Sequence, residues 1–163
     1  MNKTLILALG SEILTDDGIG LRIACDLKKE LTIQDEPKLK YRIDFASALT
    51  GSPDLLEIIK GYDTLVIIDA IKTKNGNPGN VYHYSLKNYK ETFHLENIHD
   101  ISFPDTLKLG KSIGLKIPEN VNILAIEIFD NLTFGNTLSE ILTKKYSEIL
   151  KKVKKLVFVT SAS

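Results

Sequence analysis

The chain has 163 residues, 43% hydrophobic and 26% charged, and its 21 basic and 21 acidic side chains give a formal net charge of zero. This length suits one domain with a buried core, so we predict a single domain over residues 1–163. Because binding to phosphates needs a basic excess or a basic face, the balanced charge gives no case for a nucleic-acid partner. Cys25 is the one cysteine, which excludes an internal disulfide and a cysteine-based metal cluster.

The first apolar stretch, Leu5–Leu9, is followed closely by charged residues, beginning with Glu12. It is too short for a signal peptide or a membrane span, so we expect a cytoplasmic protein without a membrane partner. Residues 4–9 therefore predict a buried central strand. The apolar residues that follow recur at helical spacing from about Gly18 to Leu31 and predict a first helix. Cys25 falls on its apolar face, which favours a buried thiol over a nucleophile.

The middle of the chain continues the alternation of strands and helices. Residues 41–45 predict a second strand, and Ser52 and Pro53 begin a helix that ends before Gly61. Residues 64–68 form the clearest strand, apolar from the second residue onward and followed directly by an aspartate. A turn-forming stretch then leads to a short strand over residues 81–85.

The last third of the chain is predicted to contain a helix, a strand and a second helix. Ser102 begins the first helix with a capping-box pattern, and Gly114 ends it. Residues 121–129 predict the last strand. Ser139 caps a final helix with apolar positions as far as Val153, and residues 156–160 fit either a continuation of this helix or an extended tail.

Strands that alternate with helices predict a three-layer α/β/α sandwich, with a mainly parallel twisted sheet of about five strands. In such folds ligands bind outside the carboxyl ends of the strands. Two acidic positions lie there: Asp17 follows the first strand, and Asp69 ends the most buried one. Charge at the edge of a core costs free energy unless it is paired, hydrogen-bonded or bound to a cation. The structural alternatives are that Asp69 caps a loop or pairs with a lysine, and that Asp16 and Asp17 cap the first helix.

Three histidines are present: His83, His94 and His99. Any of them can complete a site with Asp17 and Asp69, and such a mixed oxygen and nitrogen set suits zinc or nickel. Spacing alone does not choose among the three.

Other chemistries fit the sequence less well. The motifs G-x-S-x-G, G-x-G-x-x-G and H-E-x-x-H and the phosphate-binding P-loop are absent from the sequence. A receiver domain also carries acidic residues after its first and third strands, but it adds a lysine at the end of its last one. The last predicted strand here ends in Phe129 and Asp130 instead.

Five segments together resemble the nickel–iron hydrogenase maturation proteases. Residues 10–20 read Gly-Ser-Glu-Ile-Leu-Thr-Asp-Asp-Gly-Ile-Gly, which is similar to the family signature G-N-x-L-x-x-D-D/E-G-x-G. Residues 65–71 resemble its apolar strand ending in D-A, and residues 78–81 its P-G-x-V turn. Residues 99–107 are similar to its histidine segment, H-x-x-x-x-x-D-x-L, and Leu138 and Ser139 resemble the L-S that opens its last helix. The resemblance spans nearly the whole chain in the right order.

The resemblance implies a phosphorylase/hydrolase-like sandwich and an endopeptidase that acts on a hydrogenase large-subunit precursor. It implies that Asp17, Asp69 and His99 bind the metal, with both aspartates catalytic, and it favours His99 over the other two histidines. Such an enzyme recognises nickel already loaded in the precursor and removes a C-terminal extension. The nickel is thus presented by the substrate, and zinc or cadmium can occupy the site in vitro. We expect a monomer.

Two departures from the family pattern lie beside the predicted cleft. Ser11 replaces the signature asparagine, and residues 45–51 lack the paired glycines that follow the second strand in the family. Because only glycine permits some backbone conformations and close approaches, this wall of the cleft must differ. The alternative functions are a non-proteolytic relative that keeps the acidic cleft as a metal- or partner-binding site and, by fold analogy, another hydrolase.

Overall fold

The computed structural model describes residues 2–34, 41–49, 55–86 and 103–161. The elements in chain order are β1 (Asn2–Leu9), α1 (Ile19–Gln34), β2 (Tyr41–Ala48), α2 (Leu55–Ile59), β3 (Thr64–Ile71), β4 (Val81–Ser85), α4 (Phe103–Ser112), β5 (Asn120–Glu127) and α5 (Glu140–Ser161). Five strands form one sheet in the order β2-β1-β3-β5-β4. The first four strands in this order are parallel, and β4 runs antiparallel to β5 at one edge.

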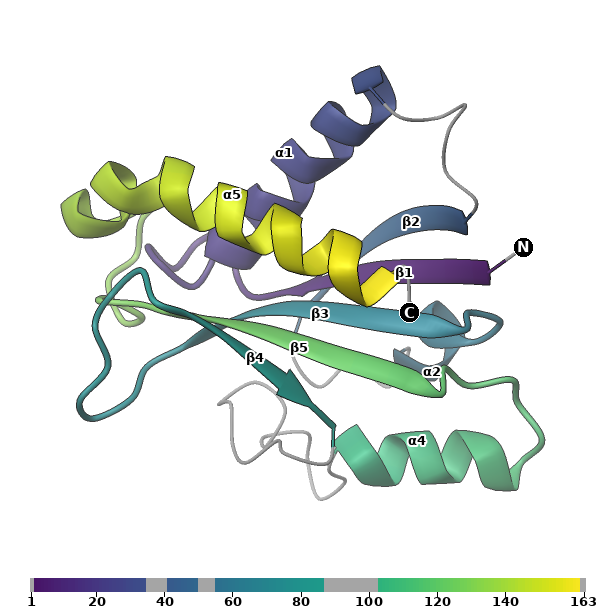
Figure 1. The fold of residues 1–163 in the computed structure, drawn as a ribbon. Coiled ribbons are helices and arrows are strands. Elements are labelled where there is room, and N and C mark those ends of the chain that lie inside the picture. Colours follow the sequence, from purple (N-terminus) through teal and green to yellow (C-terminus); the bar gives the residue numbers. More distant parts are fainter. Residues whose placement is uncertain (1, 35–40, 50–54, 87–102, 162–163) are drawn as a thin grey trace.

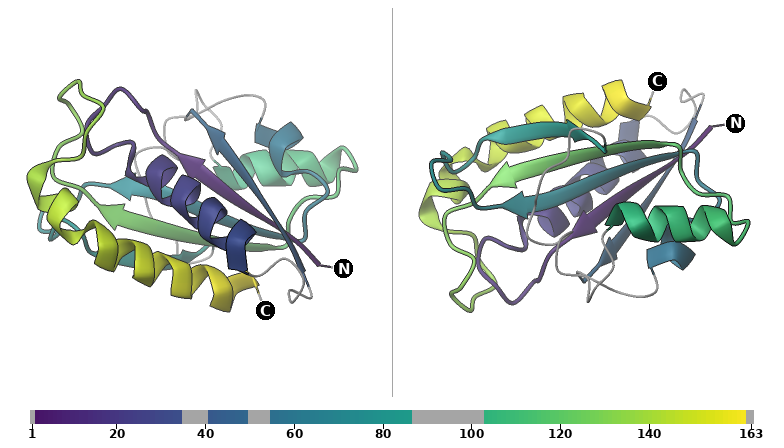
Figure 2. Two further views of the ribbon diagram at one scale, coloured as in Figure 1. Left: turned by 90° about the horizontal axis from the view of Figure 1, so that it is seen from above. Right: turned by 90° about the horizontal axis from the view of Figure 1, so that it is seen from below.

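Helices cover both faces of the sheet. Figure 1 shows α1 and α5 on one face and α2 and α4 on the other, and the two views of Figure 2 agree. This arrangement confirms the predicted three-layer α/β/α sandwich with a mainly parallel sheet. Within the described parts of the chain, no helix has the length and apolar character needed to cross a membrane.

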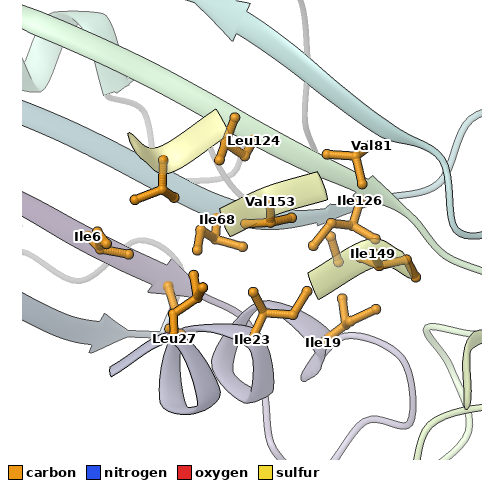
Figure 3. Packing of buried hydrophobic residues seen from close by; sticks show 14 of the residues in the cluster. Ile6, Ile19, Ile23, Leu27, Ile68, Val81, Leu124, Ile126, Ile149 and Val153 are labelled. Carbon is orange, nitrogen blue, oxygen red and sulfur yellow. The ribbon is translucent and has the colours of Figure 1, made fainter. Parts of the chain in front are cut away.

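Side chains of alternate strand residues enter two separate cores, because successive residues of a strand point to opposite faces. Even-numbered residues of β1, β3 and β5, such as Ile6, Ile68 and Leu124, pack against α1 and α5, as Figure 3 shows. Odd-numbered residues of the same three strands, such as Leu7 and Ile67, pack against α2 and α4. All eight residues of β3 are buried, as expected for a central strand covered on both faces.

Several predicted boundaries were wrong, and in β2 and β3 the pairing with neighbouring strands carries the strand past its predicted end. β3 continues through Asp69 to Ile71, since Asp69 is in register with Ala125 of β5. β2 continues to Ala48 beside Leu9 of β1. β5 ends at Glu127, two residues earlier than predicted.

The last helix and the cysteine also differ from expectation. Residues 156–160 continue α5, and Val157 and Thr160 are buried against the fold. Cys25 is exposed, which corrects the prediction of a buried thiol. The buried positions of α1 include Ile23, Ala24 and Leu27, and this spacing leaves Cys25 at the flank of the buried stripe.

Candidate active site at the carboxyl edge of the sheet

Asp69 lies in the centre of the sheet, near the carboxyl end of β3. Asp69 is fully buried, with 0% exposure. Its Oδ1 accepts a hydrogen bond of 2.8 Å from the backbone N–H of Ala70. As an odd-numbered residue of β3, Asp69 projects to the face that α2 and α4 cover. A carboxylate in such a position needs polar partners, since burying an unpaired charge costs several kcal/mol or more.

Asp17 is held by the loop that leaves β1. Its Oδ2 accepts a hydrogen bond of 2.7 Å from the backbone N–H of Ser11. Gly10 makes this geometry possible: its φ is 136°, and a Cβ there would lie 2.2 Å from the carbonyl oxygen of Asp17. Only glycine tolerates both the dihedral angle and the close approach. The loop therefore folds back so that Asp17 lies over the end of β1.

A second glycine joins the loop to the two central strands. A Cβ on Gly20 would lie 2.8 Å from the carbonyl oxygen of Ile68 and 3.1 Å from that of Leu9. Gly20 is the second residue of α1 and follows Asp17 closely, and Ile68 directly precedes Asp69. The start of α1 thus packs on the carboxyl ends of β1 and β3, which places both aspartates at the same edge of the sheet.

Asp16 has a different role from its neighbour. It is 0% exposed, and its carboxylate accepts hydrogen bonds from the backbone N–H groups of Phe129 (3.2 Å), Asp130 (2.8 Å) and Ser139 (2.7 Å). The structural alternative in which the side chain of Asp16 caps α1 is therefore corrected, because this side chain reaches the segment between β5 and α5. Of the two adjacent acids, Asp16 holds the loops together and Asp17 lies at the edge of the sheet.

The histidines separate into two groups. His83 pairs with Leu124 across β4 and β5, and its Nε2 lies 2.8 Å from Oδ1 of Asn122. Both partners are even-numbered residues of β5, so His83 projects to the α1 and α5 face, opposite to the face that Asp69 occupies. His83 therefore does not join Asp69. His94 and His99 lie outside the described residues.

The sequence prediction missed a buried acid at the same edge of the sheet. Glu127 ends β5 and is 1% exposed. Its Oε1 accepts a hydrogen bond of 2.6 Å from Thr73 N–H, and its Oε2 one of 3.0 Å from the Thr73 hydroxyl. The sequence carries a signal for Glu127, because this acid lies within the mostly apolar stretch from Val121 to Ile128. Asp69 was identified by the same kind of signal, a charge beside an apolar run.

Two tyrosines of β4 lie on the same face as Asp69. Tyr82 is in register with Ala125, which is itself in register with Asp69, so the three residues form one row across the sheet. The rings of Tyr82 and Tyr84 stack with centroids 6.1 Å apart. Burial, and then the neighbouring Tyr82 and Glu127, raise the pKa of Tyr84 above its ordinary value.

Two of the three predicted metal ligands, Asp17 and Asp69, lie in the described residues. Among them, no group of three or more His, Cys, Asp and Glu side chains is placed to hold a metal ion. The donors Asp17 and Asp69 are hard oxygen ligands that fit a divalent cation, and the third predicted donor, His99, is outside the described part.

Residues 22–156 match the family model for hydrogenase maturation protease. This span includes Asp69 and His99 and begins after Asp17. No curated protein sequence matches the chain significantly.

Solved structures of similar fold carry related names. The chain is similar to the hydrogenase-maturating endopeptidase HybD from E. coli, with 22% identity over 94% of this chain and 90% of that one and a TM-score of 0.68. It is also similar to the [NiFe] hydrogenase maturation protease HybD from Thermococcus kodakarensis, with 25% identity over 96% and 99% of the two chains and a TM-score of 0.64. The match of the family model over most of the chain shows that this protein is a peptidase of the hydrogenase maturation protease family.

Proposed function

We propose that this protein is an endopeptidase that removes the C-terminal extension of a nickel-loaded nickel–iron hydrogenase large-subunit precursor. The observation that carries the proposal is the placement of Asp17 and Asp69 at one edge of the sheet in a chain of this family. The family is named for hydrogenase maturation, and the two similar HybD structures are named for the same process. The precursor is the proposed partner, in the cytoplasm, and the enzyme acts as a monomer.

Asp17 and Asp69 are the proposed catalytic residues, and together with His99 they are the proposed ligands of the substrate's nickel. The nickel belongs to the precursor, so it is part of the substrate that this site recognises. Zinc or cadmium can take the same place in vitro, because carboxylate and imidazole donors suit them as well. When bound, such a cation can polarise a carbonyl or lower the pKa of a water.

The residues of the chain support two versions of the hydrolysis. In both, a water oxygen adds to the scissile carbonyl, the C–N bond breaks and the departing nitrogen takes a proton. In the first version Asp17 and Asp69 would hold the substrate's nickel, which would supply Lewis-acid activation of the carbonyl or the water, and the proton of the water passes to the departing nitrogen. In the second, Asp17 is the general base that takes the proton from water, and its orientation is held by the Ser11 N–H. The two versions predict different rates of cleavage when the nickel of the substrate is replaced by a weaker Lewis acid.

The change from asparagine to serine at position 11 is compatible with proteolysis. The group that holds Asp17 is the backbone N–H of Ser11, and any residue except proline supplies it. The hydroxyl of Ser11 instead accepts a 3.4 Å hydrogen bond from Ile13 N–H. This departure therefore leaves the support of Asp17 unchanged.

The test incubates the purified protein with nickel-loaded and with nickel-free precursor and follows loss of the C-terminal peptide by mass spectrometry. We expect cleavage of the nickel-loaded form only. Asp17→Asn and Asp69→Asn should each lower the rate by about 100-fold or more, a typical cost of removing a catalytic acid or base. Lack of cleavage of either precursor by the wild type would contradict the proposal and leave a non-proteolytic binding protein as the function.

A further inference from the structure

Two segments far apart in the sequence form a small hydrogen-bonded ribbon beside the candidate site. Residues 13–16 run next to residues 130–135, with Thr15 N donating to Thr133 O at 3.0 Å and Asp16 N to Asp130 O at 3.1 Å. Gly135 N donates to Ile13 O at 3.0 Å, and Leu14 and Phe134 form an antiparallel bridge. We call residues 13–16 and 130–135 the rim ribbon.

Two acidic side chains fix the ribbon from within. The buried carboxylate of Asp16 accepts hydrogen bonds from the N–H of Asp130, where the second segment begins, and from the N–H of Ser139, four residues past its end. Oδ1 of Asp130 accepts hydrogen bonds from Leu132 N–H at 2.9 Å and Thr133 N–H at 3.1 Å. Hydrogen bonds to charged groups are stronger than those between neutral groups, so the ribbon has a defined conformation.

This well-supported ribbon exposes large apolar side chains. Leu132 is 79% exposed and Phe134 is 78% exposed. The nine residues 131–139 contain no charged side chain, in a chain of which 26% is charged. Apolar residues held in water by specific hydrogen bonds are typical of a contact surface, and the uncharged stretch 131–139 that carries them favours a partner segment that is itself apolar and uncharged.

The ribbon is continuous with the candidate site. Its first segment ends at Asp16, directly before Asp17, and Leu14 of that segment pairs with Phe134. A polypeptide bound at Asp17 and extending outward along this loop would therefore meet Phe134 and Leu132.

We propose that Leu132 and Phe134 of the rim ribbon bind an apolar, uncharged segment of the precursor that lies next to the scissile bond. The inference rests on the proposed function, because the occupant is the substrate of that site. The contact is made equally in the bound substrate and in the transition state, so its loss should raise KM and leave kcat little changed.

The experiment compares wild type with the double variant Leu132→Ser and Phe134→Ser, using the nickel-loaded precursor of the large subunit from the same organism. We expect the KM of the double variant to rise at least about tenfold with little change in kcat, since apolar anchors of an interface carry most of its affinity. Ile113→Ser is the matched control. Ile113 is 62% exposed and lies near Gly114 and Lys116, toward the amino ends of the strands; its replacement should leave KM unchanged.

The outcomes separate this inference from the proposed function. Cleavage by both proteins with KM values within twofold would overturn the role of the ribbon and leave the function intact. If the wild type fails to cleave, sedimentation velocity measures how strongly each protein binds the same precursor. Weaker binding by the double variant than by the wild type supports the proposed role of the rim ribbon. Equal binding by the two proteins, or no binding by either, overturns it. A wild-type dimer that the double variant abolishes, with KM unchanged, would identify a second copy of the chain as the occupant and also overturn the proposal.

Discussion

Oδ1 of Asp16 accepts a 2.7 Å hydrogen bond from the backbone N–H of Ser139, 123 residues later in the chain. The same carboxylate also holds the N–H groups of Phe129 and Asp130. One buried side chain therefore ties the loop after β1 to the segment between β5 and α5. This connection positions the loop that carries Asp17.

Replacement of Asp16 by alanine should lower the free energy of unfolding by about 2–4 kcal/mol, because three part-buried N–H groups lose their charged acceptor. Urea unfolding followed by circular dichroism measures this change. Glu12→Ala is the control, since Glu12 is exposed in the same loop, and it should change the stability by less than about 0.5 kcal/mol. Equal stabilities of the two variants would refute the role assigned to Asp16.

Gly76→Ala should destabilise the loop between β3 and β4. A Cβ on Gly76 would lie 1.9 Å from the carboxyl carbon of Glu127 and 2.1 Å from its Oε2, so the carboxylate must leave its hydrogen bonds to Thr73. We expect a loss of about 2 kcal/mol or more in urea unfolding.

A variant of Glu127 tests whether the cost of Gly76→Ala comes from this contact. Glu127→Ala removes the obstructing carboxylate, so adding Gly76→Ala to it should cost less than the same change in the wild type. Strict additivity of the two changes would show that the two residues do not compete for the same space. Gly61→Ala is a useful comparison, because Gly61 has φ of 85° without a close neighbour in the described parts, and its cost should come from backbone strain alone.

His99→Ala should abolish precursor cleavage and leave the fold intact, whereas His83→Ala should keep wild-type activity. His83 projects to the sheet face opposite to Asp69 and contacts Asn122, so its imidazole does not reach the edge that the substrate would occupy. Cleavage assays of His83→Ala, His94→Ala and His99→Ala, each with a circular dichroism spectrum, measure this. Retained cleavage by His99→Ala would refute the ligand assignment.

The conformation of the rim ribbon should depend on pH through Asp130. Hydrogen bonds from the Thr133 hydroxyl and from the N–H groups of Leu132 and Thr133 hold the pKa of the Asp130 carboxyl below its ordinary value. With a folded-state pKa lower than the unfolded one, the contribution of Asp130 is complete above the ordinary aspartate pKa of about 3.9 and is lost as pH falls through the lower folded value.

An NMR titration of the Leu132 and Thr133 amide shifts should therefore have its midpoint below about pH 3.9. Asp130→Asn is the control, and it should remove the titration of both amides. A midpoint above the ordinary aspartate value would contradict the assigned hydrogen bonds.

The arrangement of layers was predictable because the local pattern of apolar residues indicates which faces of the strands and helices are buried. The run from Leu65 to Ile68 identified a strand covered on both faces, and β3 is buried throughout. Element ends were less predictable. Asp69 was expected to end β3, but backbone pairing with β5 carries the strand on to Ile71, and such pairing depends on a neighbour more than fifty residues away in the chain.

The sequence by itself determined the α/β/α class, the two acidic positions Asp17 and Asp69, and the family to which they point, since these follow from local patterns and motifs. Only the tertiary structure showed that Asp16 ties two loops together, because the N–H groups that its carboxylate binds lie more than a hundred residues away in the chain. It also separated His83 from Asp69, since the face on which a side chain lies depends on strand register. Contacts between residues distant in the chain decide both questions, and a local pattern does not contain them.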